Sequence, residues 1–167
     1  MVKLEGCHRK RSARLTQIGV FVLALGGLGM VPAKALLRAT NLAALGAVAR
    51  AHHTPIVLLF WSPTCRYCGV VERDFVEPDR HEPRFRSIIF RRVNIDSDKR
   101  LVDFAGHVTT EARFAKRFHV RLVPDIKFFN GQGRIVAPEM LGLSTPSFYE
   151  SYLDSALQTA QRACQKP

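Results

Sequence analysis

The sequence lacks the residue spacings of the common metal and haem sites. It holds four cysteines in 167 residues, and of these Cys65 and Cys68 form the single C-x-x-C pair. No second C-x-x-C pair and no H-x-x-x-H spacing supplies the further ligands that a tetrahedral zinc ion needs. Gly69 follows the pair, where covalent haem attachment requires histidine. We therefore expect no metal and no other cofactor.

Acidic residues are also few. Asp and Glu number 14 against 25 Lys and Arg, which gives a net charge of +11. Residues 1–35 hold six basic residues and Glu5, a net of +5, so +6 remains for the rest of the chain (11 − 5). This excess favours anionic partners or a negative membrane surface, unless it is simply a solvated basic surface. Because stacked aromatics do not accompany the basic residues, we expect no nucleic-acid partner.

The apolar stretch near the N-terminus is short for a membrane-spanning helix. It runs uncharged from Ile18 to Val31, whereas a bilayer core needs roughly 20 residues. A basic zone through Arg14 precedes it, and the small-x-small sequence Ala33-Lys34-Ala35 follows. This order is typical of a secretory signal peptide.

The N-terminal pattern predicts export. We expect residues 1–35 to be a signal peptide cleaved after Ala35, which leaves residues 36–167 as the mature domain. The alternative is an uncleaved anchor that tethers the domain with the same orientation, since the positive charges stay inside. Either way the domain reaches an oxidising compartment, which we take to be a bacterial periplasm. Cys7 is expected to be lost with the signal.

The remaining chain alternates helical and strand patterns without internal repeats. Residues 56–61 are a continuous apolar run rich in strand formers, which predicts a strand buried on both faces. Asn130-Gly131-Gln132-Gly133 predicts a hairpin turn. The first expected elements are a helix capped by Thr40 or Asn41 that runs to about Arg50, strand 56–61, and helix 65–76 capped by Thr64 and ending before Pro78. They are followed by strand 87–95, a helix capped by Thr109 or Thr110 that runs through Phe118, strands 126–129 and 134–136, and a last helix from Thr145-Pro146.

This order predicts an α/β fold with a central mixed sheet and helices on both of its faces. The last helix carries an apolar stripe that we expect to pack against the sheet. The stripe consists of Phe148, Tyr152, Leu153, Ala156, Leu157 and Ala160.

The pair Cys65-Arg66-Tyr67-Cys68 lies after the buried strand and at the start of the next helix. Unpaired N–H groups and the helix dipole favour an anion there, so they lower the pKa of Cys65 and favour its reactive thiolate. Arg66 adds a positive charge, and Cys68 is close enough to attack a mixed disulfide at Cys65. A purely structural disulfide is the alternative, but a bridge across two residues constrains little of the chain.

Two separated segments resemble those of thioredoxin-like proteins. The first runs from Phe60 through Trp61-Ser62-Pro63-Thr64 to the cysteine pair and is similar to the active-site segment of that family. The second, residues 118–129 with Val123-Pro124-Asp125 at its centre, is similar to the cis-proline segment. The resemblance covers about residues 40–160. It is closest to exported thioredoxins of the sulfur-oxidation type. These carry a longer stretch after the second strand, and residues 94–110 match that stretch in position.

The resemblance implies a thioredoxin-like fold and a role for each matched residue. Cys65 is the attacking thiolate, Cys68 the resolving thiol, and Pro124 the cis-proline that keeps neighbouring backbone groups open to an extended substrate. Trp61 packs beside the site. The other residues placed in the active-site environment are Pro63, Arg66, Tyr67, Val123 and Asp125.

Two positions depart from the family pattern. Leu59 occupies the position of the buried acid that cytoplasmic thioredoxins carry two residues before the tryptophan. A proton relay through that acid is therefore absent or different. Val123 and Asp125 flank the proline, where many exported relatives have threonine. If Asp125 lies near the pair, it raises the pKa of Cys65 and opposes Arg66; the alternative is a solvated aspartate.

The function expected from these residues is an exported thiol–disulfide oxidoreductase that reduces protein disulfides. Its partners are protein disulfides or thiols, together with a membrane electron donor or acceptor. Two alternatives stay open: a periplasmic disulfide oxidant, and a redox-inactive binding or chaperone module of the same fold. Cys164 is expected to be an inert residue near the C-terminus, although pairing with another chain is possible.

Overall fold

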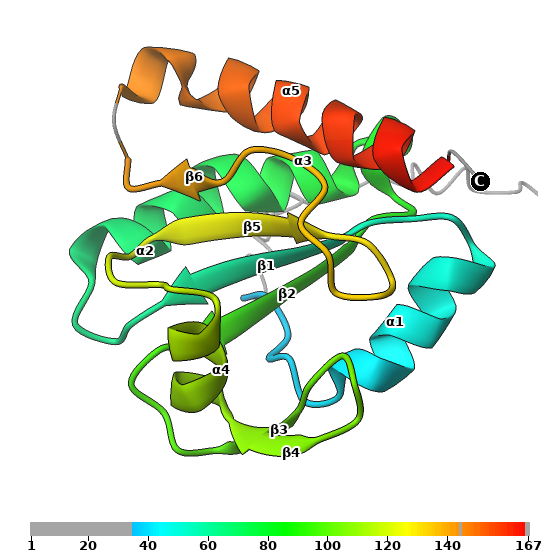
Figure 1. The fold of residues 1–167 in the computed structure, drawn as a ribbon. Helices are drawn as coiled ribbons and strands as arrows, with labels where there is room; N and C mark the ends of the chain where they lie inside the picture. Colours follow the sequence, from blue (N-terminus) through cyan, green and yellow to red (C-terminus); the bar gives the residue numbers. More distant parts are fainter. Residues whose placement is uncertain (1–34, 144, 166–167) are drawn as a thin grey trace, which may run out of the picture. The chain divides into compact units, whose positions relative to one another are not determined.

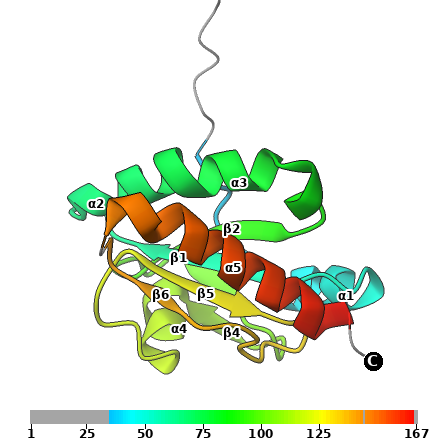
Figure 2. The same cartoon turned by 90° about the horizontal axis from the view of Figure 1, so that it is seen from above.

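The computed structural model describes residues 35–143 and 145–165. They form a four-stranded mixed sheet with helices on both faces, which confirms the predicted fold class (Figures 1 and 2). The strand order is β2-β1-β5-β6, with β1 parallel to β2 and antiparallel to β5. The strands are β1 (Ile56–Trp61), β2 (Ile89–Asn94), β5 (Asp125–Phe129) and β6 (Met140–Leu141). Nearly all of the predicted signal peptide lies outside the described residues.

Strand β1 is at the centre of the molecule. Its first five residues are buried, because the sheet has helices on both sides. Val57 and Leu59 pack with α5 (Pro146–Gln165) and with the segment from α2 (Arg66–Val71) onward. Leu58 and Phe60 pack on the opposite face with α1 (Leu42–Ala51) and α4 (Glu111–Arg117). The apolar run therefore supplies side chains to both cores, as its lack of alternation predicted.

Side-chain caps define the starts of two predicted helices. The Asn41 side chain accepts a hydrogen bond from the Ala44 amide at the start of α1. The Thr110 hydroxyl accepts one from the Arg113 amide at the start of α4. Both caps satisfy amides that have no partner within the helix.

The helix after the cysteine pair does not end before Pro78, so that prediction was wrong. It continues from α2 through a π-helical turn (Glu72–Val76) into α3 (Glu77–His81), followed by a 3-10 turn (Pro83–Phe85). In the π turn the Glu77 amide donates to the Glu72 carbonyl, five residues back. A proline inside a regular α-helix clashes with the carbonyl four residues earlier. The wider π turn just before Pro78 lets the chain remain helical.

The predicted hairpin forms its turn but only part of its second strand. The Asn130 amide donates to the Arg134 carbonyl, and the Val136 amide donates to the Phe128 carbonyl. Residues 134–136 contribute a single bridge, between Phe129 and Ile135, and regular pairing with β5 resumes only in β6. Pro138 lies between these segments and has no N–H to donate to a sheet.

The stretch between β2 and α4 folds as a separate hairpin. It consists of β3 (Arg100–Val102) and β4 (Val108–Thr110), which pair antiparallel. The sequence indicated that this stretch extends the family pattern, but its two strands were not predicted.

The apolar stripe of α5 is only partly buried. Tyr149, Leu153, Ala156, Leu157 and Ala160 pack into the core. The prediction was wrong for Phe148 and Tyr152, which are 58% and 60% exposed. These two lie four residues apart on the neighbouring face of the helix, which the sheet does not reach. No helix among the described residues is long and apolar enough to cross a membrane.

Candidate active site at the Cys65–Cys68 disulfide

Hydrogen bonds fix the turn between β1 and α2. The Ser62 hydroxyl donates to Asp96 Oδ2 over 2.5 Å, lies 2.9 Å from the Thr64 hydroxyl, and accepts from the Thr64 amide. The Cys65 amide donates to the Ser62 carbonyl. Thr64 therefore takes part in the turn and does not cap α2, contrary to prediction. Asp96, from the loop after β2, was not foreseen as a support of the site.

Cys65 is itself the N-terminal cap of α2. It forms a disulfide with Cys68, with the two Cα atoms 5.5 Å apart. The Cys65 sulfur accepts a hydrogen bond from the Cys68 amide over 3.1 Å. An amide aimed at this sulfur stabilises negative charge on it once the disulfide is reduced.

The two cysteines differ in access to solvent. Cys65 is partly exposed, whereas Cys68 is 2% exposed and packs in the core. A bulky partner can therefore reach the sulfur of Cys65 but not that of Cys68. This asymmetry fits Cys65 as the residue attacked first and Cys68 as the residue that resolves.

The proline segment lies directly against the disulfide. The Val123–Pro124 peptide bond is cis, and the Val123 carbonyl oxygen lies 3.5 Å from the Cys65 sulfur. The Gly142 amide donates to the Pro124 carbonyl over 2.7 Å, which joins this segment to the end of β6. Within residues 35–143 and 145–165, the Val123 backbone groups pair with no other backbone group. They are free to pair with an incoming chain.

Arg92 lies over the Trp61 ring and forms an ion pair with Glu72, and neither contact was predicted from the sequence. The Arg92 guanidinium carbon lies 4.6 Å from the Trp61 ring centroid, and its Nη1 lies 3.3 Å from Glu72 Oε2. Glu72, at the end of α2, also accepts from the Leu36 amide. Arg92 thus links β2, the tryptophan and the active-site helix. Only the tertiary structure identifies the partners of Arg92.

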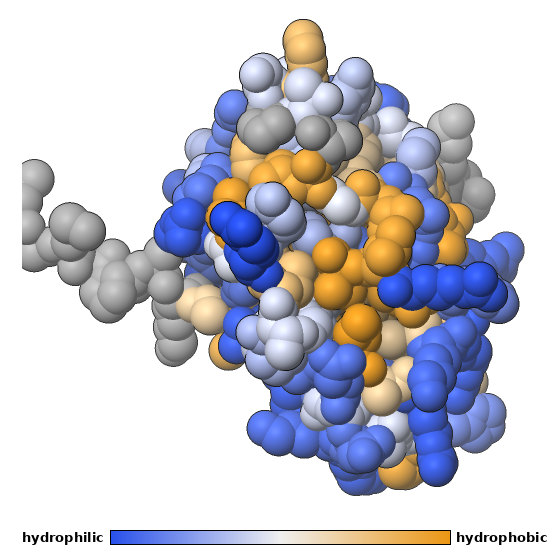
Figure 3. Space-filling model, turned by 90° about the vertical axis from the view of Figure 1, so that its left-hand side faces the viewer, coloured by the Kyte–Doolittle hydropathy of each residue, from blue (hydrophilic) through white to orange (hydrophobic). Residues whose placement is uncertain are grey.

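The other residues expected around the site form its outer rim. Pro63, Arg66 and Tyr67 are exposed, and the Arg66 guanidinium carbon lies 5.2 Å from the Tyr67 ring centroid. Figure 3 views the end of the molecule where β1 finishes and α2 begins, and hydrophobic atoms gather there inside a hydrophilic border. The rim therefore offers a mixed apolar and positive surface.

Asp125 is not solvated, so that alternative was wrong. It is 2% exposed and forms an ion pair of 3.1 Å with the buried Lys127, which also binds Glu139. Burial raises the pKa of Asp125, and the Lys127 ammonium partly opposes this rise. Leu59, in the position of the family acid, is fully buried among apolar residues. The buried carboxyl next to Pro124 is therefore that of Asp125 on β5. It is paired with Lys127, which was not predicted as a site residue.

We predict that Asp125→Asn lowers the pKa of Cys65. Removing a negative charge two residues from the Val123 carbonyl makes the thiolate easier to form. Because Lys127 offsets that charge, we expect a fall of about half a unit to one unit. The pH dependence of Cys65 alkylation by iodoacetamide measures it. Glu139→Gln, which removes the more exposed partner of Lys127, is the control and is expected to shift the pKa less. An unchanged Cys65 pKa in Asp125→Asn contradicts this role.

The histidines that the structure describes and Cys164 are not grouped into a second site. Among the residues that the structure describes, no cluster of three or more His, Cys, Asp or Glu side chains is arranged to hold a metal. Cys164 is half-buried, and burial raises the pKa of its thiol. It is therefore a weaker nucleophile than a cysteine at a helix start.

A mixed sheet with a C-x-x-C disulfide at the start of a helix, facing a proline segment, defines a thioredoxin-like thiol–disulfide oxidoreductase at the level of the family. A family model described as a thioredoxin-like domain matches residues 44–157. The chain belongs to this family. No protein in the curated comparison matches it.

Solved structures show the same fold. Oxidised thioredoxin O2 from Arabidopsis thaliana is 18% identical, with a TM-score of 0.50, and the match covers 73% of this chain and 90% of that one. Mitochondrial thioredoxin 3 from Saccharomyces cerevisiae is 13% identical, with a TM-score of 0.51 and coverage of 74% and 93%. Thioredoxin f from spinach chloroplast is 17% identical, with a TM-score of 0.50 and coverage of 77% and 97%.

Proposed function

We propose that this protein is an exported thiol–disulfide oxidoreductase that reduces protein disulfides. The observation that carries the proposal is the asymmetry of the pair. Cys65 is accessible, caps α2 and accepts the Cys68 amide, whereas Cys68 is buried behind it. A purely structural disulfide does not require one accessible, activated sulfur and one buried sulfur.

The proposed reaction is a two-step dithiol–disulfide exchange. The Cys65 thiolate attacks one sulfur of the client disulfide, the client S–S bond breaks, and the other client sulfur leaves as a thiolate. Cys68 then loses its proton and attacks the Cys65 sulfur. The mixed disulfide breaks, the client leaves as a dithiol, and the protein keeps the Cys65–Cys68 disulfide. Leu59 carries no group that accepts the Cys68 proton, so a departing client thiolate is the natural acceptor.

The Val123 backbone is proposed to align the client. Its carbonyl oxygen lies 3.5 Å from the Cys65 sulfur, and its N–H and C=O pair with no other backbone group of the described residues. An extended client segment can therefore pair there as an added strand. This pairing places a client sulfur near Cys65 without requiring a particular client sequence.

The location follows from the N-terminal pattern. The basic zone, the apolar run and the Ala33-Lys34-Ala35 motif support export to a periplasm, as a soluble or tethered domain. A reductase in an oxidising compartment must be supplied with electrons across the membrane, so we propose a membrane donor. The β3–β4 extension is compatible with the sulfur-oxidation type of exported thioredoxin, and we propose that subfamily.

The reduction potential of the Cys65–Cys68 pair tests the direction of electron flow. We expect a value near −270 mV, as in thioredoxin. The full chain, with Cys7 and Cys164 replaced by serine, is equilibrated in dithiothreitol buffers, and its free thiols are counted. A value near −120 mV contradicts the reductase and supports a disulfide oxidant. If no reversible couple is found, redox function is excluded and a binding module of this fold remains.

A further inference from the structure

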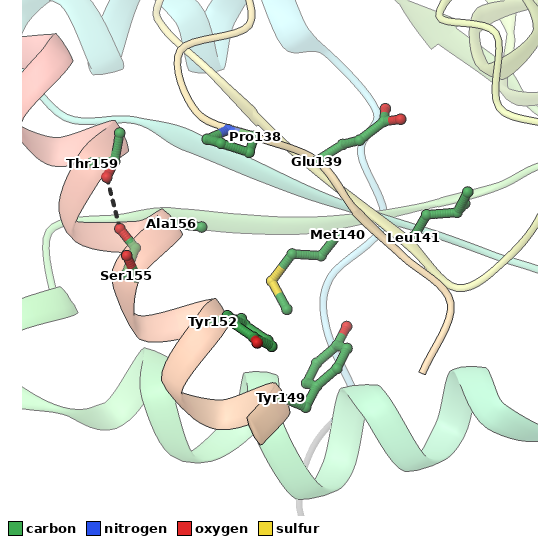
Figure 4. A pocket seen from close by; sticks show the side chains of 9 residues that line it. All are labelled: Pro138, Glu139, Met140, Leu141, Tyr149, Tyr152, Ser155, Ala156 and Thr159. Atoms are coloured by element: carbon green, nitrogen blue, oxygen red, sulfur yellow. Dashed lines mark hydrogen bonds between the residues drawn. The ribbon is translucent and has the colours of Figure 1, made fainter. Parts of the chain in front are cut away.

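A cavity lies between the edge strand β6 and helix α5. It has a volume of about 350 Å³, at the lower end of the range for ligand pockets. Figure 4 shows Pro138, Met140 and Leu141 on one side and Tyr149, Tyr152 and Ala156 on the other. Apolar and aromatic side chains thus form most of its wall.

One wall of the cavity adjoins the proline segment of the redox site. Leu141 pairs with Asp125 across β5 and β6, and the next residue, Gly142, donates to the Pro124 carbonyl. In Figure 1 the end of β6 and the start of α5 lie at the same end of the sheet as the start of α2. An extended chain paired with Val123 therefore passes Leu141 and arrives at the cavity.

Tyr149 forms part of the cavity wall from within the core. Its side chain is almost fully buried, and its hydroxyl has no hydrogen-bond partner among the described residues. Because the hydroxyl oxygen is itself shielded, a chain in the cavity would contact the tyrosine ring and not this oxygen.

The exposed aromatics of α5 complete the surface. Tyr152 is 60% exposed and lines the cavity, and Leu141 at its other rim is 49% exposed. Large apolar groups that are exposed around a cavity are typical of contact surfaces for a partner.

We infer that this cavity is a specificity pocket for client proteins, which takes one bulky apolar side chain from the extended segment flanking the client's disulfide cysteine. The inference rests on the proposed function. It adds a rule for client choice, because clients with Phe, Leu or Met at the right distance from the cysteine should react faster.

Synthetic peptides test this pocket. Each carries one cysteine as a disulfide with thionitrobenzoate, and phenylalanine or serine occupies successive positions on either side of it. The Cys65 thiolate of the reduced full chain attacks the peptide sulfur, the S–S bond breaks, and the coloured thionitrobenzoate thiolate leaves with the electron pair. The release of thionitrobenzoate gives a second-order rate constant for each peptide. Cys7 and Cys164 are replaced by serine in every protein tested.

We expect phenylalanine at one position to raise the rate constant about tenfold over serine, as burial of an aromatic side chain would. Tyr152→Ser is expected to abolish this gain and leave the serine peptide unaffected. Tyr149→Phe removes only the shielded hydroxyl and is expected to leave the gain unchanged. Phe148→Ser is the matched control: this exposed aromatic of the same helix does not line the cavity, and the gain should persist.

The outcomes separate the two proposals. If the wild-type chain reacts with no peptide, the proposed function fails and the pocket fails with it. If all peptides react equally, or if Tyr152→Ser keeps the gain, the pocket is overturned and the oxidoreductase stands. If sedimentation shows a dimer that Tyr152→Ser dissociates, a second copy fills the cavity and the inference is also overturned.

Discussion

Cys68→Ala is expected to halt turnover at the mixed disulfide between Cys65 and the client. The first attack needs only Cys65, which is partly exposed and accepts the Cys68 amide, and alanine keeps that amide. The second step needs the Cys68 sulfur, so multiple turnover of a disulfide protein such as insulin should fall by about a thousandfold or more. Intact-protein mass spectrometry under non-reducing conditions should show the trapped adduct.

Cys65→Ser is expected to abolish both turnover and the adduct. Cys68 is 2% exposed, so a client disulfide cannot reach it. Cys164→Ser is the control, and it should leave turnover unchanged because that half-buried thiol has a raised pKa. If Cys65→Ser still forms the adduct, the roles of the two cysteines are reversed. If Cys68→Ala turns over normally, the dithiol mechanism is wrong.

Asp79→Asn is expected to stabilise the protein markedly at neutral and alkaline pH. Asp79, on α3, is 3% exposed, and its Oδ2 has no partner among the described residues. Burial and the nearby carboxylates of Glu82, Asp154 and Glu150 raise its pKa from 3.8 to about 7, while Arg84 opposes them. The folded protein therefore binds a proton at Asp79 more tightly than the unfolded chain does.

The sign of the pH dependence follows from this raised pKa. Between about pH 4 and pH 7 the folded state retains the proton and the unfolded state loses it, so the stability of the wild-type protein falls as pH rises through this window. Above it the folded state holds a buried carboxylate. The difference between 3.8 and about 7 corresponds to about 4 kcal/mol at most, and we expect Asp79→Asn to recover about 2 to 4 kcal/mol near pH 8.

Urea unfolding at several pH values measures this gain. The difference between Asp79→Asn and wild type should disappear below about pH 4, where the carboxyl is protonated in both states. Asp74→Asn is the matched control in the same helical segment, since Asp74 is exposed and paired with Arg73. It is expected to change stability little at any pH. If Asp79→Asn lowers stability equally at all pH values, the aspartate has a structural role unrelated to its charge.

The amino-acid sequence by itself determined the fold class, the order of the main elements and the two cysteines. These features depend on neighbouring residues: the unbroken apolar run of β1, the capping residues at 40–41 and 109–110, and the C-x-x-C pair at a helix start. Such patterns act over one or two helical turns, so they can be recognised without knowing which distant segments meet. The prediction about Pro78 failed because the compensating π turn has no comparable local signal.

The tertiary structure alone decided which distant residues support the site. Lys127 and Glu139 at Asp125, Arg92 and Glu72 at Trp61, and Asp96 at Ser62 are brought together by strand pairing and helix packing. The same packing leaves Phe148 and Tyr152 exposed and the Tyr149 hydroxyl buried without a partner. A periodic stripe shows that a helix has an apolar face, but the width of the sheet beneath it determines how much of that face is covered. The cavity proposed as a client pocket follows from this mismatch between the helix and the sheet.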